Sequence, residues 1–255
     1  MDRNEDEKNA MKDMEKTAPR WFPPQLKTLM IVIVPFLLIL LAVRLILATA
    51  SFLVSLEYER AIFPEDPYGF STEDRIYWSM VDIEYLIDNS LTIDYFDNYT
   101  LATGEPMHNE RELRHMEDVK NLSEGFWMTG RVLLIIFIIM SALLWNLESP
   151  SEFGRVLRGG ARATFLLMLA VLLAVILGFG DFFVGFHRIF FEGDTWLFKY
   201  SDTFIRLYPE LFWQDLFILL AMLTALSAGI LEFSGWKLRN LTSCYEFSSD
   251  DIGNM

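Results

Sequence analysis

The sequence predicts an all-α membrane protein with four transmembrane helices and a helical extracytoplasmic loop domain between the first and second spans. Four apolar stretches divide its 255 residues, and each is long enough as a helix to cross a hydrocarbon core of about 30 Å. The composition agrees, with 53% hydrophobic residues, a mean hydropathy of +0.27, and 22% charged residues for the loops. The predicted spans are Leu29 to Val54, Phe126 to Trp145, Arg162 to Phe186 and Phe212 to Phe233.

The first apolar stretch is expected to be a retained anchor. A long charged segment precedes it, and it exceeds the length of an ordinary signal-peptide core. We therefore count it as the first span.

The first outer loop, about residues 55–124, is too long and too patterned to be a simple connector. An amphipathic helix is expected in it, capped by Ser71 or Thr72. A polar turn from Asp94 to Pro106 follows, and then a second helix from Asn109 to Leu122 leads into the second span. These short helices are expected to lie on the outer surface.

Basic residues near the span ends indicate that both chain termini are cytoplasmic. Lys and Arg in short flanks favour the cytoplasmic side, and they occur before the first span, in the short second loop and after the fourth span. The outer loops are then about 55–124 and 187–211. We expect a four-span membrane domain at 28–235 between cytoplasmic tails at 1–27 and 236–255.

Charge and cysteine content narrow the function classes. The net charge of −14 argues against a nucleic-acid partner, because phosphate binding needs clustered Lys and Arg. The single cysteine, Cys244, can form no disulfide within the chain. The sequence lacks a nucleophile elbow, a phosphate-binding glycine loop and a zinc-protease motif, so we expect no cofactor. Acyl transfer would require the substrate itself to supply the nucleophile.

Two of the three histidines, His115 and His187, fall on the same predicted side of the membrane. Glu112, His115 and Asp118 recur every three residues in a predicted helix and so share one broad face. Asp118 can hold one ring nitrogen of His115 and leave the other free to accept a proton. An ordinary polar helix face explains the same spacing, and a metal site is a weaker alternative, because each loop supplies one histidine.

Other candidate residues lie near the outer interface. His187 closes the third span, and the following Asp194 and Trp196 suit a site at the lipid boundary, although an aromatic-belt tryptophan is the plainer interpretation. Arg44 lies in the outer half of the first span, where an arginine is costly unless it is paired or hydrated. We expect Arg44 either to reach the interface or to bind a polar or anionic group.

Four spaced motifs occur in order along the chain. They are YERAIFPEDPYGF at Tyr58 to Phe70, ELRHMEDVK at Glu112 to Lys120, FHRIFFEGDTWLF at Phe186 to Phe198 and LYPE at Leu207 to Glu210. In these motifs the chain resembles the bacterial four-span membrane proteins of unknown-function domain 1461, a family that includes the lipoprotein intramolecular transacylase. The resemblance extends from the first span to the fourth.

The resemblance implies an enzyme of the bacterial cell membrane that acts on diacylglyceryl-modified lipoproteins among the membrane lipids. It would move the sn-2 acyl chain to the α-amine of the N-terminal cysteine and leave a lyso-form lipoprotein. Such a reaction needs a base, an electrostatic stabiliser and a held geometry. We assign His115, oriented by Asp118, as the base, and His187 as the stabiliser of the departing oxygen. The candidate substrate-binding residues are Arg44, Glu112, Lys120, Asp194 and Trp196.

Two other classes of function remain open from the sequence. One is a metal-dependent membrane lipid or peptide hydrolase that uses both histidines, whose activity a chelator would abolish. The other is a non-catalytic tetraspan adaptor with an acidic outer loop, whose cellular role would survive replacement of both histidines.

Overall fold

The computed structural model describes residues 22–252, with side chains as far as Asn240. Residues 1–21 of the predicted N-terminal tail lie outside the described part. The elements are α2 (Pro24–Ala48), α3 (Ala50–Tyr58), α4 (Thr72–Ile87), the 3-10 helix η1 (Ile93–Asn98), α5 (Glu110–Leu147), α6 (Pro150–Phe190), α7 (Thr203–Leu207) and α8 (Glu210–Ile252). Residues 22–252 contain no strand, which confirms the all-α prediction.

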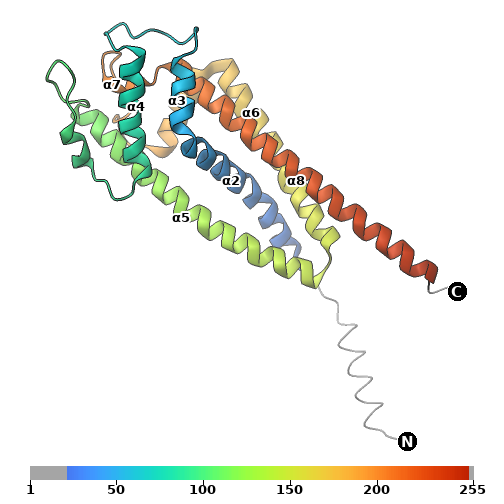
Figure 1. Ribbon diagram of the computed structural model, residues 1–255. Helices are drawn as coiled ribbons and strands as arrows, with labels where there is room; N and C mark the ends of the chain where they lie inside the picture. The colour runs from blue at the N-terminus through green and yellow to red at the C-terminus, as the bar shows by residue number, and fades with distance from the viewer. Residues whose placement is uncertain (1–21, 253–255) are drawn as a thin grey trace, which may run out of the picture.

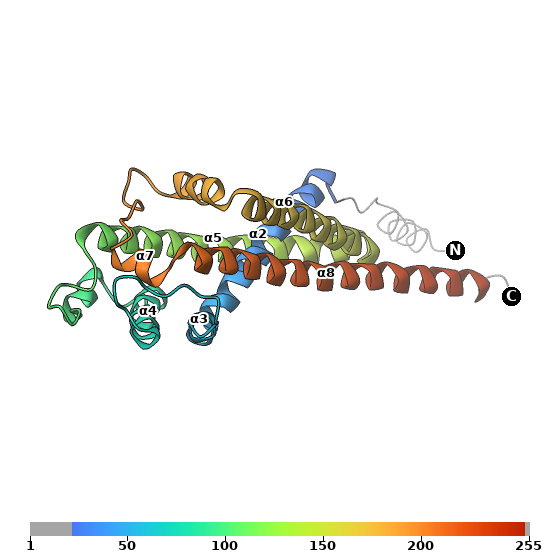
Figure 2. The same ribbon diagram turned by 90° about the horizontal axis from the view of Figure 1, so that it is seen from above.

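Four of these helices, α2, α5, α6 and α8, are long and apolar enough to cross a membrane, as predicted. They form the elongated body of the molecule, and the shorter helices α3, α4 and α7 gather at one end of it (Figure 1). We call that end the head. Seen from above, α5, α6 and α8 run in nearly the same direction, while α2 crosses between them (Figure 2).

The limits of the first span differ from the prediction. Helix α2 begins at Pro24, where a proline needs no backbone N–H and already has a helical φ. It ends at Ala48, because the chain leaves helical geometry at Thr49, whose hydroxyl donates to the carbonyl oxygen of Leu45 at 2.8 Å. The predicted stretch to Val54 therefore includes half of a separate helix, α3, which packs against α4 in the head.

Both predicted helix starts in the head are confirmed. The Ser71 hydroxyl accepts from the amide of Asp74, and the Asp74 carboxylate accepts from the amide of Ser71, so the pair closes the first turn of α4. Asn109 and Glu112 form the same reciprocal arrangement at the start of α5. Because α5 then continues without interruption to Leu147, the predicted second loop helix and the second span are one rigid element.

Glycines and ion pairs fasten the body at the end remote from the head. A Cβ placed on Gly154 of α6 would lie 2.7 Å from the carbonyl oxygen of Gly235 of α8, so only glycine allows this close helix contact. Nearby, Glu232 of α8 accepts from Arg158 at 2.8 Å and from Arg162 at 3.2 Å. Helix α8 then continues through the predicted C-terminal tail as far as Ile252.

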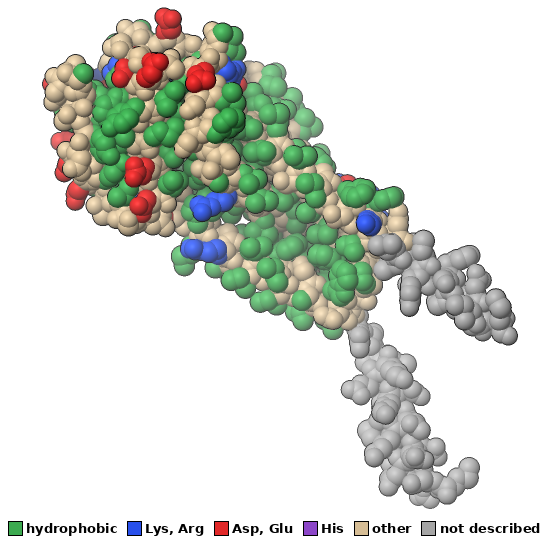
Figure 3. Space-filling view, in the orientation of Figure 1, with side chains coloured by type: hydrophobic (Ala, Val, Ile, Leu, Met, Phe, Trp, Pro, Cys, Tyr) green, Lys and Arg blue, Asp and Glu red, His purple; other side chains and the backbone are tan. Residues whose placement is uncertain are grey.

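The two parts of the molecule differ in surface chemistry. In the space-filling view, acidic side chains gather on the head, while the body is covered largely by hydrophobic side chains (Figure 3). Large apolar residues remain exposed along the spans, including Ile138, Leu166, Leu177 and Leu226. This division is expected of a bundle that lies in lipid and carries a polar head at one end.

Candidate active site

The structure brings His115 of α5 and His187 of the last turn of α6 together where the body meets the head. The centroids of the two imidazole rings are 5.9 Å apart, and the ring planes differ by 28°. Both side chains are buried, with 7% of His115 and 8% of His187 exposed. The predicted juxtaposition of these two histidines therefore exists in the structure.

Aromatic rings form the walls around the pair. The rings of Phe191, Phe198 and Phe204 lie 4.9 to 6.0 Å from that of His115. Trp196 lies 5.1 Å from His187 at an angle of 33°. Sequence analysis missed the phenylalanine walls, although the chain's 22 phenylalanines, several of them in the His187 motif, were the available signal. An apolar wall of this kind excludes water and disfavours a charge on either ring.

A backbone hydrogen bond fixes the orientation of one imidazole. Nδ1 of His187 lies 2.8 Å from the carbonyl oxygen of Phe183, one turn earlier in α6. A carbonyl oxygen only accepts, so Nδ1 of His187 carries the proton and donates it. In the neutral ring, Nε2 then has a free lone pair, which is the state that a general base requires.

Two nitrogen atoms in the site are buried without a partner. They are Nδ1 of His115 and Nε1 of Trp196, neither of which has a hydrogen bond within the described residues. An indole N–H can only donate, and leaving it unsatisfied in a buried place costs about 1–3 kcal/mol. Such groups suit a site whose missing acceptor arrives with the substrate.

Helix α5 holds the segment 191–204 over the histidines through three polar side chains. Arg111 donates to the carbonyl oxygen of Leu197 at 2.8 Å, and Glu112 accepts from the amide of Phe204 at 2.7 Å. Asp118 accepts from the hydroxyl of Thr195 at 3.2 Å. The predicted hydrogen bond from His115 to Asp118 is absent from the described part of the chain, because this carboxylate is directed to the segment instead.

Two of the predicted substrate-binding residues, Glu112 and Lys120, are buried and form hydrogen bonds that hold the fold together. Glu112, only 1% exposed, caps α5 and binds Phe204. The ammonium group of Lys120 is buried and donates to three carbonyl oxygens at the end of α4 and just beyond it, those of Tyr85, Asp88 and Leu91. Helix C-termini leave such carbonyls without partners, and a lysine satisfies them.

The remaining predicted residues are divided between two places. Trp196 belongs to the histidine site, and Asp194 lies exposed in the turn just before it. Arg44 of α2 lies elsewhere, in a cavity that includes Trp127 and Arg131 of α5 but neither histidine. The structure therefore does not bring Arg44 to the candidate active site.

The third histidine, His108, is a buried structural residue. It follows the predicted polar turn closely in the sequence, yet it is 3% exposed, and its Nε2 lies 2.8 Å from the carboxylate of Asp82. The second oxygen of that carboxylate accepts from the hydroxyl of Tyr208 at 2.9 Å. Burial opposes a charge on His108, but the Asp82 carboxylate outweighs it and raises the pKa of His108 to about 9.

The alternative of a metal-dependent hydrolase would require several ligating side chains close together. Among residues 22–240, no group of three His, Cys, Asp or Glu side chains is placed to hold a metal ion. Glu112 and Asp118, each three residues from His115 in α5, are bound to the segment 191–204.

The fold and the site define a four-span membrane protein with a pair of buried histidines enclosed by aromatic rings beside the polar head. Over residues 28–213 the chain matches the model of the family described as lipoprotein intramolecular transacylase Lit. The chain belongs to this family.

Individual proteins agree with this assignment. An uncharacterised protein of Aquifex aeolicus (strain VF5) is 30% identical over 207 residues, which span 81% of this chain and 91% of that protein. The membrane-integral lipoprotein intramolecular transacylase of Bacillus cereus has the same fold, with a TM-score of 0.68 at 20% identity over 88% of this chain and 100% of that one. A form of that protein with a histidine-to-arginine substitution gives 0.63 at 18% identity, over 87% of this chain and 95% of the other.

Proposed function

We propose that this protein moves the sn-2 acyl chain of a diacylglyceryl-modified lipoprotein to the α-amine of its N-terminal cysteine. The observation that carries the proposal is the stacked pair of His115 and His187 inside an aromatic enclosure, in a chain that belongs to the transacylase family. The amine nitrogen forms a bond to the acyl carbon, and the bond from that carbon to the sn-2 oxygen breaks. The amine proton ends on the sn-2 oxygen, so no water and no cofactor is consumed.

In this proposal His187 is the base, which reverses the order of roles inferred from the sequence. Its tautomer is set by the Phe183 carbonyl, so Nε2 can take the amine proton during attack and return it to the departing oxygen. His115 has no carboxylate to orient it and is better suited to donate a hydrogen bond to the developing charge. The free indole N–H of Trp196 is a second donor for the same purpose.

The aromatic enclosure supplies selectivity for transfer over hydrolysis. Water that reached the ester would release the acyl chain as a fatty acid, and the rings around the pair limit its access. The amine and the ester belong to one substrate molecule, so holding them together replaces a bimolecular encounter by an internal step.

The test is mass spectrometry of lipoprotein N-termini in cells with and without the protein. With the protein present, we expect peptides whose cysteine is N-acylated and carries a lyso-glyceryl group, at unchanged total mass of the lipid. Release of free fatty acid with no N-acylated product would identify a hydrolase instead.

We also propose that the head faces the extracytoplasmic side of a bacterial cell membrane and that both termini are cytoplasmic. The support is the cluster Arg155, Arg158 and Arg162 near the start of α6, at the end of the body remote from the head. A reporter fused after Asn240 is then expected to be cytoplasmic, and a tag near Asn98 to be labelled from outside. Protection of the Asn98 tag in intact cells would contradict this orientation.

A further inference from the structure

A separate cavity lies between α2 and α5 on the other face of α5 from the histidines. It has a volume of about 710 Å³ and is lined by Arg44 of α2, by Asn121, Glu124, Trp127 and Arg131 of α5, and by Asn89, which follows α4. Glu124 is nine residues after His115, which is about two and a half helical turns, so the two side chains leave α5 in opposite directions. The cavity therefore requires an explanation other than the proposed acyl transfer.

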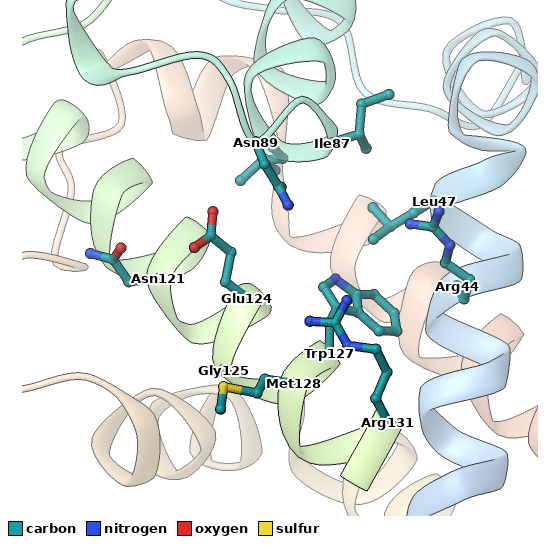
Figure 4. A pocket seen from close by; sticks show the side chains of 11 residues that line it. Arg44, Leu47, Ile87, Asn89, Asn121, Glu124, Gly125, Trp127, Met128 and Arg131 are labelled. Carbon is teal, nitrogen blue, oxygen red and sulfur yellow. The ribbon is translucent and has the colours of Figure 1, made fainter. Parts of the chain in front are cut away.

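The cavity holds two arginines at one end. Figure 4 shows the guanidinium groups of Arg44 and Arg131 on the side of the cavity where Trp127 lies. The guanidinium carbon of Arg44 is 5.6 Å from the centre of the Trp127 ring. Both arginines are exposed, and neither forms an ion pair within the described residues. At the depth of an apolar span, an arginine without a partner is costly, so an anion is the expected ligand.

The opposite end of the cavity carries a carboxylate and two amides. Glu124 lies there with Asn121 and Asn89 (Figure 4), and it too has no ion-pair partner in the described part of the chain. Glu124 and Arg131 are seven residues apart, which places them on one face of α5 about 10 Å apart along the axis. Arg131 lies within the apolar stretch of α5, and Glu124 lies beyond its end toward the head.

This order of charges matches one class of lipid. In a phospholipid the phosphate lies next to the glycerol, close to the hydrocarbon, and the headgroup amine lies further out. Both cations of the cavity lie within apolar spans, Arg44 four residues before the end of α2 and Arg131 in α5, whereas Glu124 precedes the apolar stretch of α5. Further along α5 from Arg131, away from the head, the same face carries Ile135 and Ile138, each 57% exposed. Acyl chains can lie against these side chains.

We propose that this cavity binds the headgroup of a zwitterionic phospholipid of the ethanolamine type. Arg44 and Arg131 hold the phosphate, for which the guanidinium fork is suited, and Glu124 accepts hydrogen bonds from the primary ammonium group. The two asparagines supply the remaining polar contacts.

The test is native mass spectrometry of the full chain, released from detergent that contains equal amounts of phosphatidylethanolamine, phosphatidylglycerol and phosphatidylcholine with identical acyl chains. We expect the wild type to retain the ethanolamine lipid roughly tenfold better than either other lipid, because only this lipid offers both a phosphate and an ammonium with N–H donors. The readout is lipid retention, so its result is independent of acyl transfer.

Four variants on α5 assign the contacts. Glu124→Gln is expected to bring the ratio of ethanolamine to glycerol lipid to about one, and Arg131→Gln to lower retention of all three lipids roughly tenfold. The matched controls Glu117→Gln and Arg114→Gln change exposed residues of the same helix outside the cavity and should leave retention unchanged. Equal retention of the three lipids by the wild type would overturn the proposal, and so would a wild-type lipid pattern in both Glu124→Gln and Arg131→Gln.

Discussion

Replacing His187 by alanine is expected to abolish the N-acylated, lyso-glyceryl product while the protein remains in the membrane at nearly its normal level. The variant loses Nε2 of His187, the ring nitrogen left free by the hydrogen bond from Nδ1 to the Phe183 carbonyl, and with it the proton transfer that amine attack requires. His115→Ala should have an effect of the same order, because it removes the facing ring at 5.9 Å. A loss on the order of 10³-fold or more is expected for groups that act together in one step.

The double variant distinguishes a joint mechanism from two separate contributions. If the two rings serve one step, His115→Ala combined with His187→Ala should be little worse than either single change. Tyr200→Ala provides a control, since Tyr200 belongs to the same segment 191–204 but is 83% exposed. The quantity to measure is the yield of N-acylated peptide. A loss in the double variant equal to the product of the two single losses would contradict the shared step.

Asp82→Ala is expected to destabilise the protein by about 3 kcal/mol or more at pH 7. The substitution leaves His108 and the hydroxyl of Tyr208 without their buried acceptor. His108 is therefore unsuitable as a neutral control for the other two histidines. Asp74→Ala, at the exposed start of α4, gives a matched comparison, where the loss should be about 1 kcal/mol. The thermal midpoint in detergent at a fixed scan rate measures both.

The ion pair between His108 and Asp82 makes the free energy of unfolding depend on pH. Because the pKa of His108 is raised from 6.5 in the unfolded chain to about 9 in the folded one, the folded state binds the proton more tightly. The stabilisation, on the order of 3 kcal/mol, is fully present below pH 6.5 and is lost as the pH rises through 9. The thermal midpoint should fall over this interval in the wild type, and His108→Gln should remove that component. An unchanged pH profile in His108→Gln would contradict the charged state of His108.

The four spans followed from the sequence because hydrocarbon thickness and backbone hydrogen bonding leave a long apolar stretch few alternatives. Side chains near the head were harder to assign. The motif Glu112, His115, Asp118 has the spacing of a base with its orienting carboxylate, but the partner of each carboxylate depends on where the segment 191–204 folds. That segment lies about eighty residues further along the chain, and helical spacing contains no information about it.

Buried polar residues were misjudged for a related reason. Lys120 and His108 have ordinary surface composition around them in the sequence, and only the packing of α4 against α5 shows that both are enclosed. The stacked histidines were predicted as neighbours because alternation of the spans places both on one side of the membrane. Of the two arginines in the cavity between α2 and α5, the sequence indicated Arg44 as a candidate binding residue but not Arg131, which lies within the predicted second span.

The absence of a carboxylate beside the histidine pair bears on how the site responds to its ionic surroundings. Neither His115 nor His187 takes part in an ion pair within residues 22–240. Salt screens charges over about 8 Å at physiological ionic strength, and anionic lipid changes the potential at the membrane surface over the same range. Because neither ring has an ion-pair partner, the resting state of the site contains no such pair for added salt to weaken. The site is therefore expected to respond little to the ionic strength of the solution around it.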